Sequence, residues 1–374
     1  LTLSSMDRSS DTRPRKACII TRFSALGDVA MTIPAVYGIC RSNPSTQFVM
    51  VTKAAVAPLM MNRPENLAVE GIDLKNDYRG PLAMWRLWRY LSGRYDIASF
   101  ADLHDVLRTK LLRAAAKLGG TATAAIIKDR RTKKRLIGTS TEHPATLPTT
   151  IERYADVFRR LGFAPAEKFT TLFEGQPLAD ISAITPEKRQ GERWIAIAPF
   201  AAHPSKIYPR ELMSSVVARL AALDNVRLFF FGAGAEERDR IRVWTERHRC
   251  SISLAEQRLG FPVELELLRR MDAVVTMDSA NMHLAALAGA PVVSLWGATH
   301  PCFGFGGWQQ PGSRRLGADL ECRPCSVFGN KPCRRADMLC FRRIPPADVV
   351  AAVVALLPPE TTHTSQPFPP QTLR

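Results

Sequence analysis

The sequence lacks long apolar segments of the kind that enter or cross membranes. No apolar run approaches the roughly 20 residues that a bilayer-spanning helix needs, and the first residues, "LTLSSMDRSSDTR", contain no apolar core of a secretory signal. We therefore expect a cytoplasmic protein. Hydrophobic residues make up 46% of the 374 residues, which is enough for two domains of ordinary size, each with its own core.

The sequence also lacks the signatures of the common nucleic-acid-binding modules. Its 51 Lys and Arg outnumber 35 Asp and Glu, so the formal net charge is +16, and such an excess indicates an acidic partner. Between Arg108 and Arg135, ten cations accompany one acid, Asp129. This run has no aromatic side chains to stack on bases, so we do not expect nucleic acid. A plain solvated face, a phosphorylated substrate and an anionic membrane surface remain open.

Four of the eight cysteines form a C-x2-C-x7-C-x6-C cluster at Cys322, Cys325, Cys333 and Cys340. Disulfides are not expected in a cytoplasmic chain. A structural zinc site is one interpretation, but the second pair lacks the tight spacing of a zinc ribbon. We favour reduced cysteines in a folded loop.

Short apolar runs alternate with longer segments of helical period along the whole chain. Strands are predicted at 17–21, 47–51, 95–103, 194–200, 226–234, 273–277 and 291–297. Helices are predicted at 28–40, 82–91, 106–118, 149–161, 209–223, 235–248 and 279–288. This alternation is typical of an α/β fold with parallel sheets.

The alternation stops once, in an irregular stretch with Pro and Gly, and then resumes. We expect a first Rossmann-like domain over 16–165, a linker over 166–192 and a second Rossmann-like domain over 193–358. The polar ends, 1–15 and 359–374, are expected to be disordered tails. Ligands bind beyond the carboxyl ends of the strands in such sheets, so the loops after the strands are expected to carry the chemistry.

The first of these loops, "SALGDV", places Asp28 after Gly27 where a strand gives way to a helix. An Asp at this position is more often a helix cap than a catalytic base. In the second, "PFAAHPSKIYPREL", Lys206 is placed to meet a phosphate as a point charge, although an exposed surface lysine is the simpler interpretation. The third, "FGAGAEE", is a fragment of a dinucleotide fingerprint whose Glu236 or Glu237 can accept hydrogen bonds from a ribose or complement the helix dipole.

The fourth loop, "VVTMDSANMHLAALAGAPVVSLWGATHP", is the most informative. A buried strand ends at Asp278, and Ser279 and Ala280 begin a helix of small residues. Free backbone N–H groups and the positive dipole end make such a helix start a ready anion site. His283 lies one turn further along the helix, beside this candidate phosphate site, although a single helical His is more often structural.

These loops, in this order, resemble those of the heptosyltransferases of lipopolysaccharide core synthesis, glycosyltransferase family nine. The resemblance spans about 16–357 and is firmest at "RFSALGDVAMTIPAV" and "MDSANMHLAALAGAPVVSLWGATHP". The segment "CRPCSVFGNKPCRRADMLCFRRIPPADVV" also looks like the C-terminal region of that family. The resemblance implies a GT-B architecture, in which two Rossmann-like domains face a central cleft and the second binds most of the sugar nucleotide.

The resemblance also implies roles for individual residues. Asp28 matches the general base that deprotonates the acceptor hydroxyl, and Lys206 matches the lysine that holds the donor pyrophosphate. The residues that match the cradle for the donor sugar and phosphates are Asp278, Ser279, Ala280 and His283; Glu236 matches the ribose-binding acid less closely. The sequence departs from the family pattern at two places. The family often has Gly at the position of Ala280. The loop before Lys206 reads "AAHPSK" where the family commonly has a Thr- or Gly-rich loop, which puts hydroxyl contacts to phosphate in doubt.

The acceptor side is expected in the first domain. There Ser24 and Gly27 belong to the first loop, and we expect a side chain at Gly27 to crowd the sugars. The basic run is expected to bind the anionic acceptor through Arg130, Arg131, Lys133, Lys134 and Arg135. In "AMWRLWRYL", Trp and Tyr alternate with Arg, so the helix is suited to a membrane interface; an amphipathic helix with its Trp face on the sheet is the favoured alternative.

Taken together, the sequence predicts an inverting heptosyltransferase that uses ADP-heptose. Its partners would be the ADP-sugar, an anionic lipopolysaccharide precursor and the cytoplasmic surface of the inner membrane, to which it would bind peripherally. A lysine and a helix start suffice to neutralise the diphosphate, and no Asp-x-Asp motif is present, so no cofactor is expected to be required. The alternatives are a family-nine enzyme with another sugar or acceptor, and a non-catalytic, basic protein on the same scaffold that associates with a membrane or, less in keeping with the motifs, with nucleic acid. A nicotinamide oxidoreductase is less favoured because no complete G-x-G-x-x-G follows the first strand.

Overall fold

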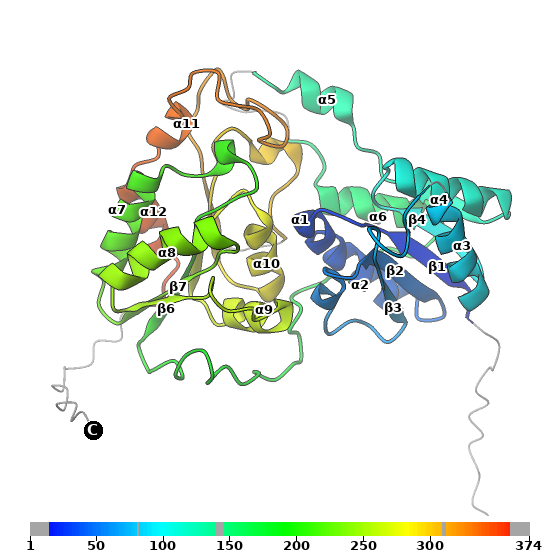
Figure 1. Ribbon diagram of the computed structural model, residues 1–374, viewed down its shortest axis with the longest axis horizontal. Coiled ribbons are helices and arrows are strands. Elements are labelled where there is room, and N and C mark those ends of the chain that lie inside the picture. Colours follow the sequence, from blue (N-terminus) through cyan, green and yellow to red (C-terminus); the bar gives the residue numbers. More distant parts are fainter. Residues whose placement is uncertain (1–14, 81, 139–145, 309–311, 360–374) are drawn as a thin grey trace, which may run out of the picture.

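Two parallel β-sheets, each covered by helices on both faces, make up the structure (Figure 1). The computed structural model describes residues 15–80, 82–138, 146–308 and 312–359. The predicted disordered tails, 1–15 and 359–374, lie outside this range apart from Arg15 and Pro359. Within these described stretches, no helix is both long and apolar enough to span a bilayer.

The first sheet has five parallel strands in the order β3-β2-β1-β4-β5. They are β1 (Ala17–Thr21), β2 (Gln47–Lys53), β3 (Leu67–Ile72), β4 (Ile97–Asp102) and β5 (Ala122–Ala125). Helices α2 (Thr32–Ser42) and α6 (Thr150–Arg160) pack on one face, and α3 (Ala83–Arg94) and α4 (Leu107–Leu118) pack on the other. Alternate residues of β1 divide between the two faces, since Ile20 packs with α2 and Ile19 with α3.

The second sheet has six parallel strands in the order β11-β10-β9-β6-β7-β8. They are β6 (Arg193–Ala198), β7 (Val226–Phe230), β8 (Ser251–Ser253), β9 (Ala273–Met277), β10 (Val292–Leu295) and β11 (Arg314–Leu316). Helices α9 (Phe261–Arg269) and α10 (Ala280–Ala288) cover one face, and α7 (Arg210–Ala221), α8 (Ala235–Arg247) and α12 (Pro346–Val354) cover the other. The short helices α5 (Arg130–Arg135) and α11 (Leu339–Arg342) lie outside these layers.

The predicted strands and helices are found, with one instructive difference. Residues 28–40 were expected to form one helix, but the chain forms α1 (Leu26–Ala30) and α2, with Met31 between them. Pro34 lies in the first turn of α2. Because proline has no N–H, it cannot donate to the carbonyl of Ala30, and the hydrogen-bond ladder of a single helix is interrupted there.

Helices α2, α6, α9 and α10 face the middle of the molecule, and their apolar side chains share one core cluster with residues of both sheets. Helix α1 packs directly against α10. A second junction joins the segment before α6 to the segment after β10, because Leu147 N donates to Cys302 O at 2.9 Å and Thr150 N donates to Gly304 O at 2.8 Å. The carboxyl ends of the two sheets are thereby held near each other.

Candidate active site between the two sheets

In the first sheet, the loops after β1 and β4 lie side by side because these strands are paired, with Thr21 opposite Asp102. The backbone N–H of Phe23 donates to Nδ1 of His104 at 3.3 Å. Burial and the nearby Arg22 guanidinium lower the pKa of His104 to about 3. This histidine is therefore neutral at physiological pH and accepts the hydrogen bond that holds the two loops together.

Asp28 lies near the start of α1 and is held by two partners. Its Oδ2 accepts a hydrogen bond from the backbone N–H of Ala25 at 3.1 Å, and it forms a close ion pair with Nη2 of Arg22. The Arg22 side chain is 8% exposed, whereas that of Asp28 is 32% exposed. These two partners hold the carboxylate in place on the protein side, and the exposed part of the carboxylate can contact a substrate, as a general base must.

In the second sheet, Lys206 and Asp278 meet where the loops after β6 and β9 adjoin. Lys206 Nζ lies 2.8 Å from Asp278 Oδ2, and the hydroxyl of Thr299 donates to the same oxygen at 2.7 Å. Both members of the ion pair are largely buried. The aligned register of β6, β9 and β10 brings these loops together.

The stem of Lys206 is fixed by a loop that follows β11. A Cβ at Gly329 would lie 2.6 Å from Lys206 Cγ and 2.8 Å from Cε, so only glycine allows this approach. Gly329 also has φ +71°, a conformation that glycine adopts without penalty, and its carbonyl accepts a hydrogen bond from the Ser205 hydroxyl. The ammonium group is therefore presented at a fixed place.

Helix α10 begins immediately beyond this ion pair. Ser279 is its N-cap residue but makes no capping side-chain bond to the backbone, so the first N–H groups of a nine-residue helix are left for another acceptor. His283, one turn further along, is buried. Burial lowers the pKa of His283 to about 4, so the imidazole is neutral at physiological pH.

A cavity of about 310 Å³ brings the two halves together. Asp28 lines it from the first domain, opposite Lys206 and Asp278 from the second. Other predicted site residues on its wall are Gly27, Ser279, Ala280 and His283. A carboxylate from one domain thus faces a lysine and a helix start from the other across one small space, an arrangement that suits transfer of a group from a phosphate leaving group.

Gly27 has a different neighbour from the one that the sequence suggested. A Cβ at this position would lie 3.1 Å from His283 Cδ2 and 3.4 Å from Ala280 Cα. The missing side chain thus makes room for α10 of the second domain. Gly27 therefore has a role in the contact between the domains. Because Gly27 also borders the cavity, the expectation that a side chain there would crowd the sugars stays a prediction.

Replacing Gly27 with Val should separate α1 from α10. We expect the rate of transfer to fall at least about tenfold, because a misplacement of about 1 Å between reacting groups costs up to 10²-fold. Steady-state kinetics with donor and acceptor varied in turn would measure the effect. Gly93→Val is the matched control, since nothing lies within 4 Å of a Cβ there; an equal loss in both variants would contradict the assignment.

A second cavity, of about 530 Å³, adjoins the first on the side of the second domain and shares Leu26, Ala202, Ser279 and Ala280 with it. Its apolar walls include Phe200, Phe231 and Phe261, and its acids are Glu237 and Glu264. Burial raises the pKa of Glu264. Apolar walls with a few converging polar groups are typical of a small-ligand site.

The placement of Glu236 does not agree with its predicted role. Its side chain is 80% exposed and pairs with Arg240 at 2.6 Å, and it borders a neighbouring cavity but not the 530 Å³ cavity. Glu237 borders both cavities, and its Oε2 accepts a hydrogen bond from Ala233 N at 2.8 Å. Successive helical residues point about 100° apart, which is why only one of these two adjacent glutamates reaches the 530 Å³ cavity.

A third cavity, of about 600 Å³, adjoins the 310 Å³ cavity on the side of the first domain, and both are bordered by Asp28 and Phe328. Its cationic lining residues are Arg22, Lys128, Arg130, Lys133, Lys134, Arg153 and Lys331. Asp28 is its single acid among the described residues. Such a cavity suits an anionic ligand with several charges.

The predicted acceptor-binding residues divide into two groups. Ser24, Arg130, Lys133 and Lys134 line the 600 Å³ cavity. Arg131 and Arg135 are exposed and do not line it. The residues of α5 point in different directions around the helix, so a run of cations in the sequence does not place all of them on one surface.

Two cations of the third cavity are buried. Lys133 Nζ lies 4.4 Å from the centroid of the Phe305 ring, and burial next to Arg153 lowers the pKa of Lys133 to about 8. Arg153 donates to Pro148 O at 3.0 Å and to Ile127 O at 3.3 Å. Burial also lowers the pKa of Arg153. A bound anion would relieve the cost of burying these charges.

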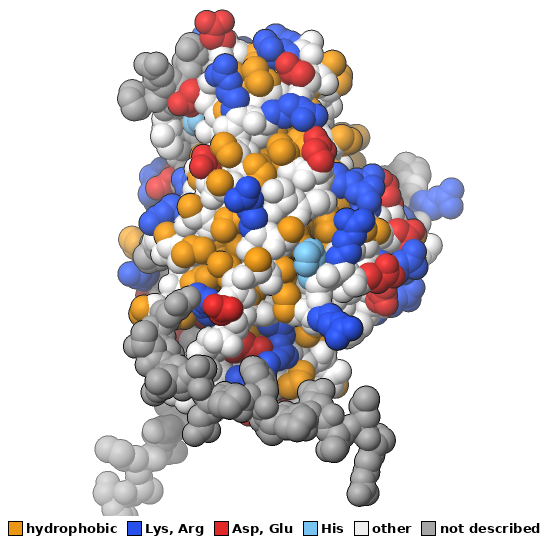
Figure 2. Space-filling view, turned by 90° about the vertical axis from the view of Figure 1, so that its left-hand side faces the viewer, with side chains coloured by type: hydrophobic (Ala, Val, Ile, Leu, Met, Phe, Trp, Pro, Cys, Tyr) orange, Lys and Arg blue, Asp and Glu red, His pale blue; other side chains and the backbone are white. Residues whose placement is uncertain are grey.

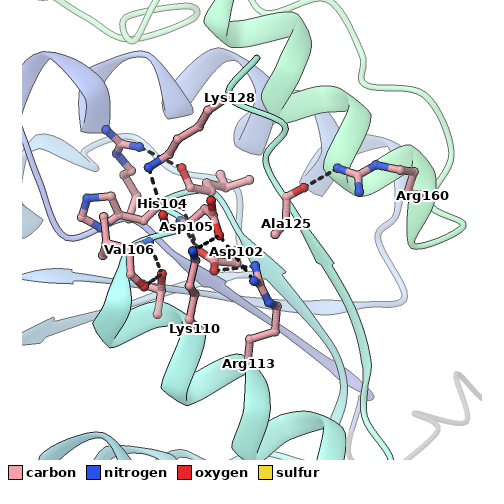
Figure 3. A network of polar contacts seen from close by, with 12 residues as sticks. Asp102, His104, Asp105, Val106, Lys110, Arg113, Ala125, Lys128 and Arg160 are labelled. Carbon is pink, nitrogen blue, oxygen red and sulfur yellow. Dashed lines mark hydrogen bonds and ion pairs between the residues drawn. The ribbon is translucent and has the colours of Figure 1, made fainter. Parts of the chain in front are cut away.

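Lys128 is positioned by the start of α4, as Figure 3 shows. Its Nζ donates to Asp105 O at 3.0 Å, while Arg113 of α4 bonds to Asp102 Oδ2 at 2.9 Å. Desolvation lowers the pKa of Lys128. This network connects the wall of the third cavity to the first turns of α4.

Several lining residues were not predicted from the sequence. Arg22 directly follows the first predicted strand, and Lys128 belongs to the basic run, so both positions carried a usable signal. Arg153 lies on a predicted helix, and the hydrophobic pattern of that helix does not show that this arginine points into the cavity. Phe328 and Lys331 belong to the cysteine-bearing segment, which gave no indication that it borders a site.

The four clustered cysteines are free thiols; Cys325 and Cys340 are buried, and Cys322 and Cys333 are partly exposed. Within the described part of the chain, no group of three or more His, Cys, Asp or Glu side chains is arranged to hold a metal ion. The zinc alternative therefore finds no support in the geometry. Burial raises the pKa of Cys340 to about 11, so this thiol remains protonated.

Comparison with known proteins finds relatives over most of the chain. The sequence model of glycosyltransferase family 9 (heptosyltransferase) matches residues 84–331. The chain is 26% identical over 374 aligned positions to lipopolysaccharide heptosyltransferase 1 of Pseudomonas aeruginosa, covering 92% of this chain and 99% of that protein.

Solved structures show the same fold. The family 9 glycosyl transferase of Veillonella parvula superposes with a TM-score of 0.71 at 16% identity, covering 92% of this chain and 98% of the other. Escherichia coli heptosyltransferase WaaC with ADP-2-deoxy-2-fluoro heptose superposes with a TM-score of 0.63 at 16% identity, covering 90% and 99%. The predicted GT-B architecture with two facing Rossmann-like domains is confirmed.

Proposed function

Because the chain belongs to glycosyltransferase family 9 and is a glycosyltransferase, we propose that it transfers a heptose from ADP-heptose to the inner core, Kdo or heptose, of a lipopolysaccharide precursor with inversion at the anomeric carbon. The observation that carries this proposal is the 310 Å³ cavity, in which Asp28 faces Lys206 and the start of α10. The relative from P. aeruginosa is a lipopolysaccharide heptosyltransferase, and the E. coli neighbour carries an ADP-heptose analogue, which supports both substrates.

Asp28 acts as the general base. Its carboxylate accepts the proton of the acceptor hydroxyl while the oxygen forms a bond to the anomeric carbon, and the bond from that carbon to the ADP oxygen breaks. A base on one side and a leaving group on the other give inversion. The ion pair with Arg22 and the N–H of Ala25 hold the carboxylate in a fixed orientation.

Lys206 and the first N–H groups of α10 stabilise the diphosphate as charge develops on it. In the free protein, Lys206 is paired with Asp278, so the donor would meet a lysine that is already positioned. Neutral His283 can donate a hydrogen bond without adding charge. Preorganised donors of this kind supply the largest share of stabilisation in many transferases.

The nucleoside occupies the 530 Å³ cavity in this proposal. Its aromatic walls suit an adenine ring. Glu237 and Glu264 replace Glu236 as the acids that accept hydrogen bonds from the ribose, because they line the cavity and Glu236 does not. The anomeric carbon would then lie in the adjoining 310 Å³ cavity.

The 600 Å³ cavity holds the acceptor in this proposal. Its cations match the carboxylates and phosphates of a Kdo-bearing lipid A. Such an acceptor is anchored in a bilayer, so we also propose that the enzyme acts at the cytoplasmic surface of the inner membrane. The net charge of +16 fits a partner of this kind.

The decisive experiment incubates the protein with ADP-heptose and defined lipopolysaccharides that carry no heptose or one heptose. Release of ADP and the mass of the product report transfer. We expect turnover with one of these acceptors. Turnover with another nucleotide sugar in place of ADP-heptose would move the assignment to a different sugar, and failure with every heptose acceptor would refute it.

The burial of Lys133 predicts a dependence of acceptor binding on pH. Its pKa of about 8 in the free protein means that it is charged below pH 8 and neutral above it. An anionic acceptor binds the charged form more tightly, so the KM for the acceptor is expected to rise above pH 8, by at most about tenfold per pH unit. Lys133→Gln should abolish this rise, whereas Lys134→Gln, at the next and exposed position, should retain it.

A further inference from the structure

The outer face of α4 carries an apolar stripe that has no partner within the described part of the chain. Leu107 is 74% exposed, Leu111 is 49% exposed and Leu118 is 91% exposed. With exposed Ala114, these residues are spaced by four, three and four positions. That spacing keeps them within one stripe of a helix, since residues three and four apart lie on the same face.

This stripe is separate from the face by which α4 packs on its sheet. The packed face is made by Thr109, Leu112 and Ala116, which are fully buried. Their positions fall on the opposite side of the helix from Leu107, Leu111 and Leu118. The helix is therefore apolar on two opposite sides, and only one side is needed for the fold.

Helix α3 packs beside α4 and extends the same surface (Figure 1). Its Trp88 packs edge-on against Phe100 of the sheet with ring centroids 6.1 Å apart, as the favoured interpretation of this helix predicts. Trp85 departs from that interpretation, because it is 51% exposed and lies under the guanidinium of Arg89. Leu82, before the first turn, is 65% exposed.

The charges on the two helices have one sign. Helices α3 and α4 contain seven Lys and Arg and no Asp or Glu. Arg113, Lys110 and Arg94 reach carboxylates of the same domain. The cations that pair with no carboxylate among the described residues are Arg86, Arg89, Arg108 and Lys117.

The opposite side of the molecule is different. Figure 2 shows the outer face of the second domain, over α7, α8 and α12, where basic and acidic side chains are mixed. Helix α8 alone carries Glu236, Glu237, Asp239 and Glu246 among its arginines. Among these helices, only α3 and α4 combine charges of one sign with exposed leucines.

We propose that the outer face of α3 and α4 binds an anionic phospholipid bilayer, with Leu107, Leu111, Leu118 and Trp85 entering the interface and with Arg89, Arg108 and Lys117 meeting lipid phosphates. An apolar stripe bordered by Lys and Arg, with a Trp, is the arrangement of helices that lie in a membrane surface. The inference rests on the proposed function for the membrane-anchored acceptor, and it assigns the surface that meets that membrane.

The surface is continuous with the acceptor cavity. His104 lines that cavity, and Leu107, the first residue of the stripe, follows it by three positions. Lys128, also on the cavity wall, is bonded to Asp105 at the start of α4 (Figure 3). A bilayer against α4 would therefore lie beside the cavity that receives the sugar of a lipid-anchored acceptor.

Co-flotation with lipid vesicles, without donor or acceptor, tests the proposal. We expect the full chain to bind vesicles containing phosphatidylglycerol at least about tenfold more tightly than vesicles of pure phosphatidylcholine. The variant L107S/L111S/L118S should bind the anionic vesicles at least about tenfold more weakly, and R108Q/K117Q should lose most of the preference for anionic lipid. Unchanged binding in both variants would overturn the proposal.

Matched variants on the second domain or linker serve as controls. Leu178→Ser removes an equally exposed leucine, and R238Q/R247Q removes two exposed cations from α8; both are expected to bind like the wild type. Light scattering would show whether the leucine variant instead dissociates an oligomer, a result that would make this face an interface between copies and overturn the proposal.

Transfer assays separate this inference from the proposed function. The leucine variant is expected to keep wild-type turnover with a water-soluble acceptor sugar and to lose at least about tenfold with the acceptor embedded in anionic vesicles. Equal loss with both acceptors would count against a membrane role. Failure of all transfer with intact vesicle binding would refute the heptosyltransferase proposal and leave the membrane surface standing.

Discussion

Replacing Asp28 with Asn is expected to lower the rate of transfer by about 10²- to 10⁴-fold, the range that general base catalysis supplies, while the affinity for the ADP-sugar stays within about twofold. The amide oxygen of Asn can still accept from Arg22 and from Ala25 N–H, the two partners of the carboxylate. The variant therefore keeps the hydrogen bonds that position α1, but it loses the negative charge and the ability to take a proton. Rapid-quench kinetics and calorimetric titration with a non-transferable ADP-sugar would measure the two effects.

Thermal unfolding distinguishes this result from a loss of folding. Arg22 is almost fully buried, so part of the effect of Asp28→Asn will appear as lowered stability, because a buried charge has lost its counter-ion. Asp96→Asn, at a carboxylate that pairs with Lys16 on the surface, provides the comparison. If Asp28→Asn retains transfer at the wild-type rate, Asp28 is a helix-capping residue and the base lies elsewhere.

Replacing Lys206 with Met is expected to lower kcat/KM for the donor by about 10²- to 10³-fold, as removal of one preorganised donor at a developing charge does in other enzymes. Methionine keeps most of the stem that packs against Gly329 and removes the ammonium group that meets Asp278. Both ground-state binding of the diphosphate and departure of ADP should suffer. Donor titrations and single-turnover rates would measure each loss separately.

Two further variants make the Lys206 result specific. Lys168→Ala removes an exposed lysine outside the cavities and is expected to behave like the wild type. Gly329→Ala should push the Lys206 stem aside, since its Cβ would lie 2.6 Å from Cγ, and it should raise the donor KM by displacing the ammonium group without removing it. Wild-type donor kinetics in Lys206→Met would remove the lysine from the diphosphate site.

Much of the fold was predictable because parallel α/β sheets leave a strong signal in sequence. Buried strands such as β1 and β9 are continuous apolar runs, and the helices that cover them follow the 3.6-residue period. The edge strands β3, β5, β8 and β11 were missed because they are only partly buried and short or mixed in character. The break between α1 and α2 depends on a single missing N–H at Pro34, which the apolar pattern does not show.

The site was predictable where a residue follows a strand directly and less so elsewhere. Asp28, Lys206 and Asp278 lie in loops at the carboxyl ends of strands, and the structure brings all three to one cavity. The choice between Glu236 and Glu237 depended on the rotation of α8, which its charged sequence leaves undefined. The apolar stripe on α4 was not recognised in the sequence, because Lys and Arg lie between its leucines along the chain.

The loop formed by residues 326–331 touches both substrates' sites. Ser326, Val327, Phe328, Asn330 and Lys331 border the 600 Å³ cavity that we propose for the acceptor, whereas Gly329 packs against Lys206, which we propose for the donor diphosphate. The enzyme therefore cannot diversify this loop freely. Substitutions at positions 327, 328, 330 and 331 can change the acceptor only if the backbone at 329 keeps its position. We therefore expect relatives with other acceptors to differ here by substitutions and not by insertions or deletions.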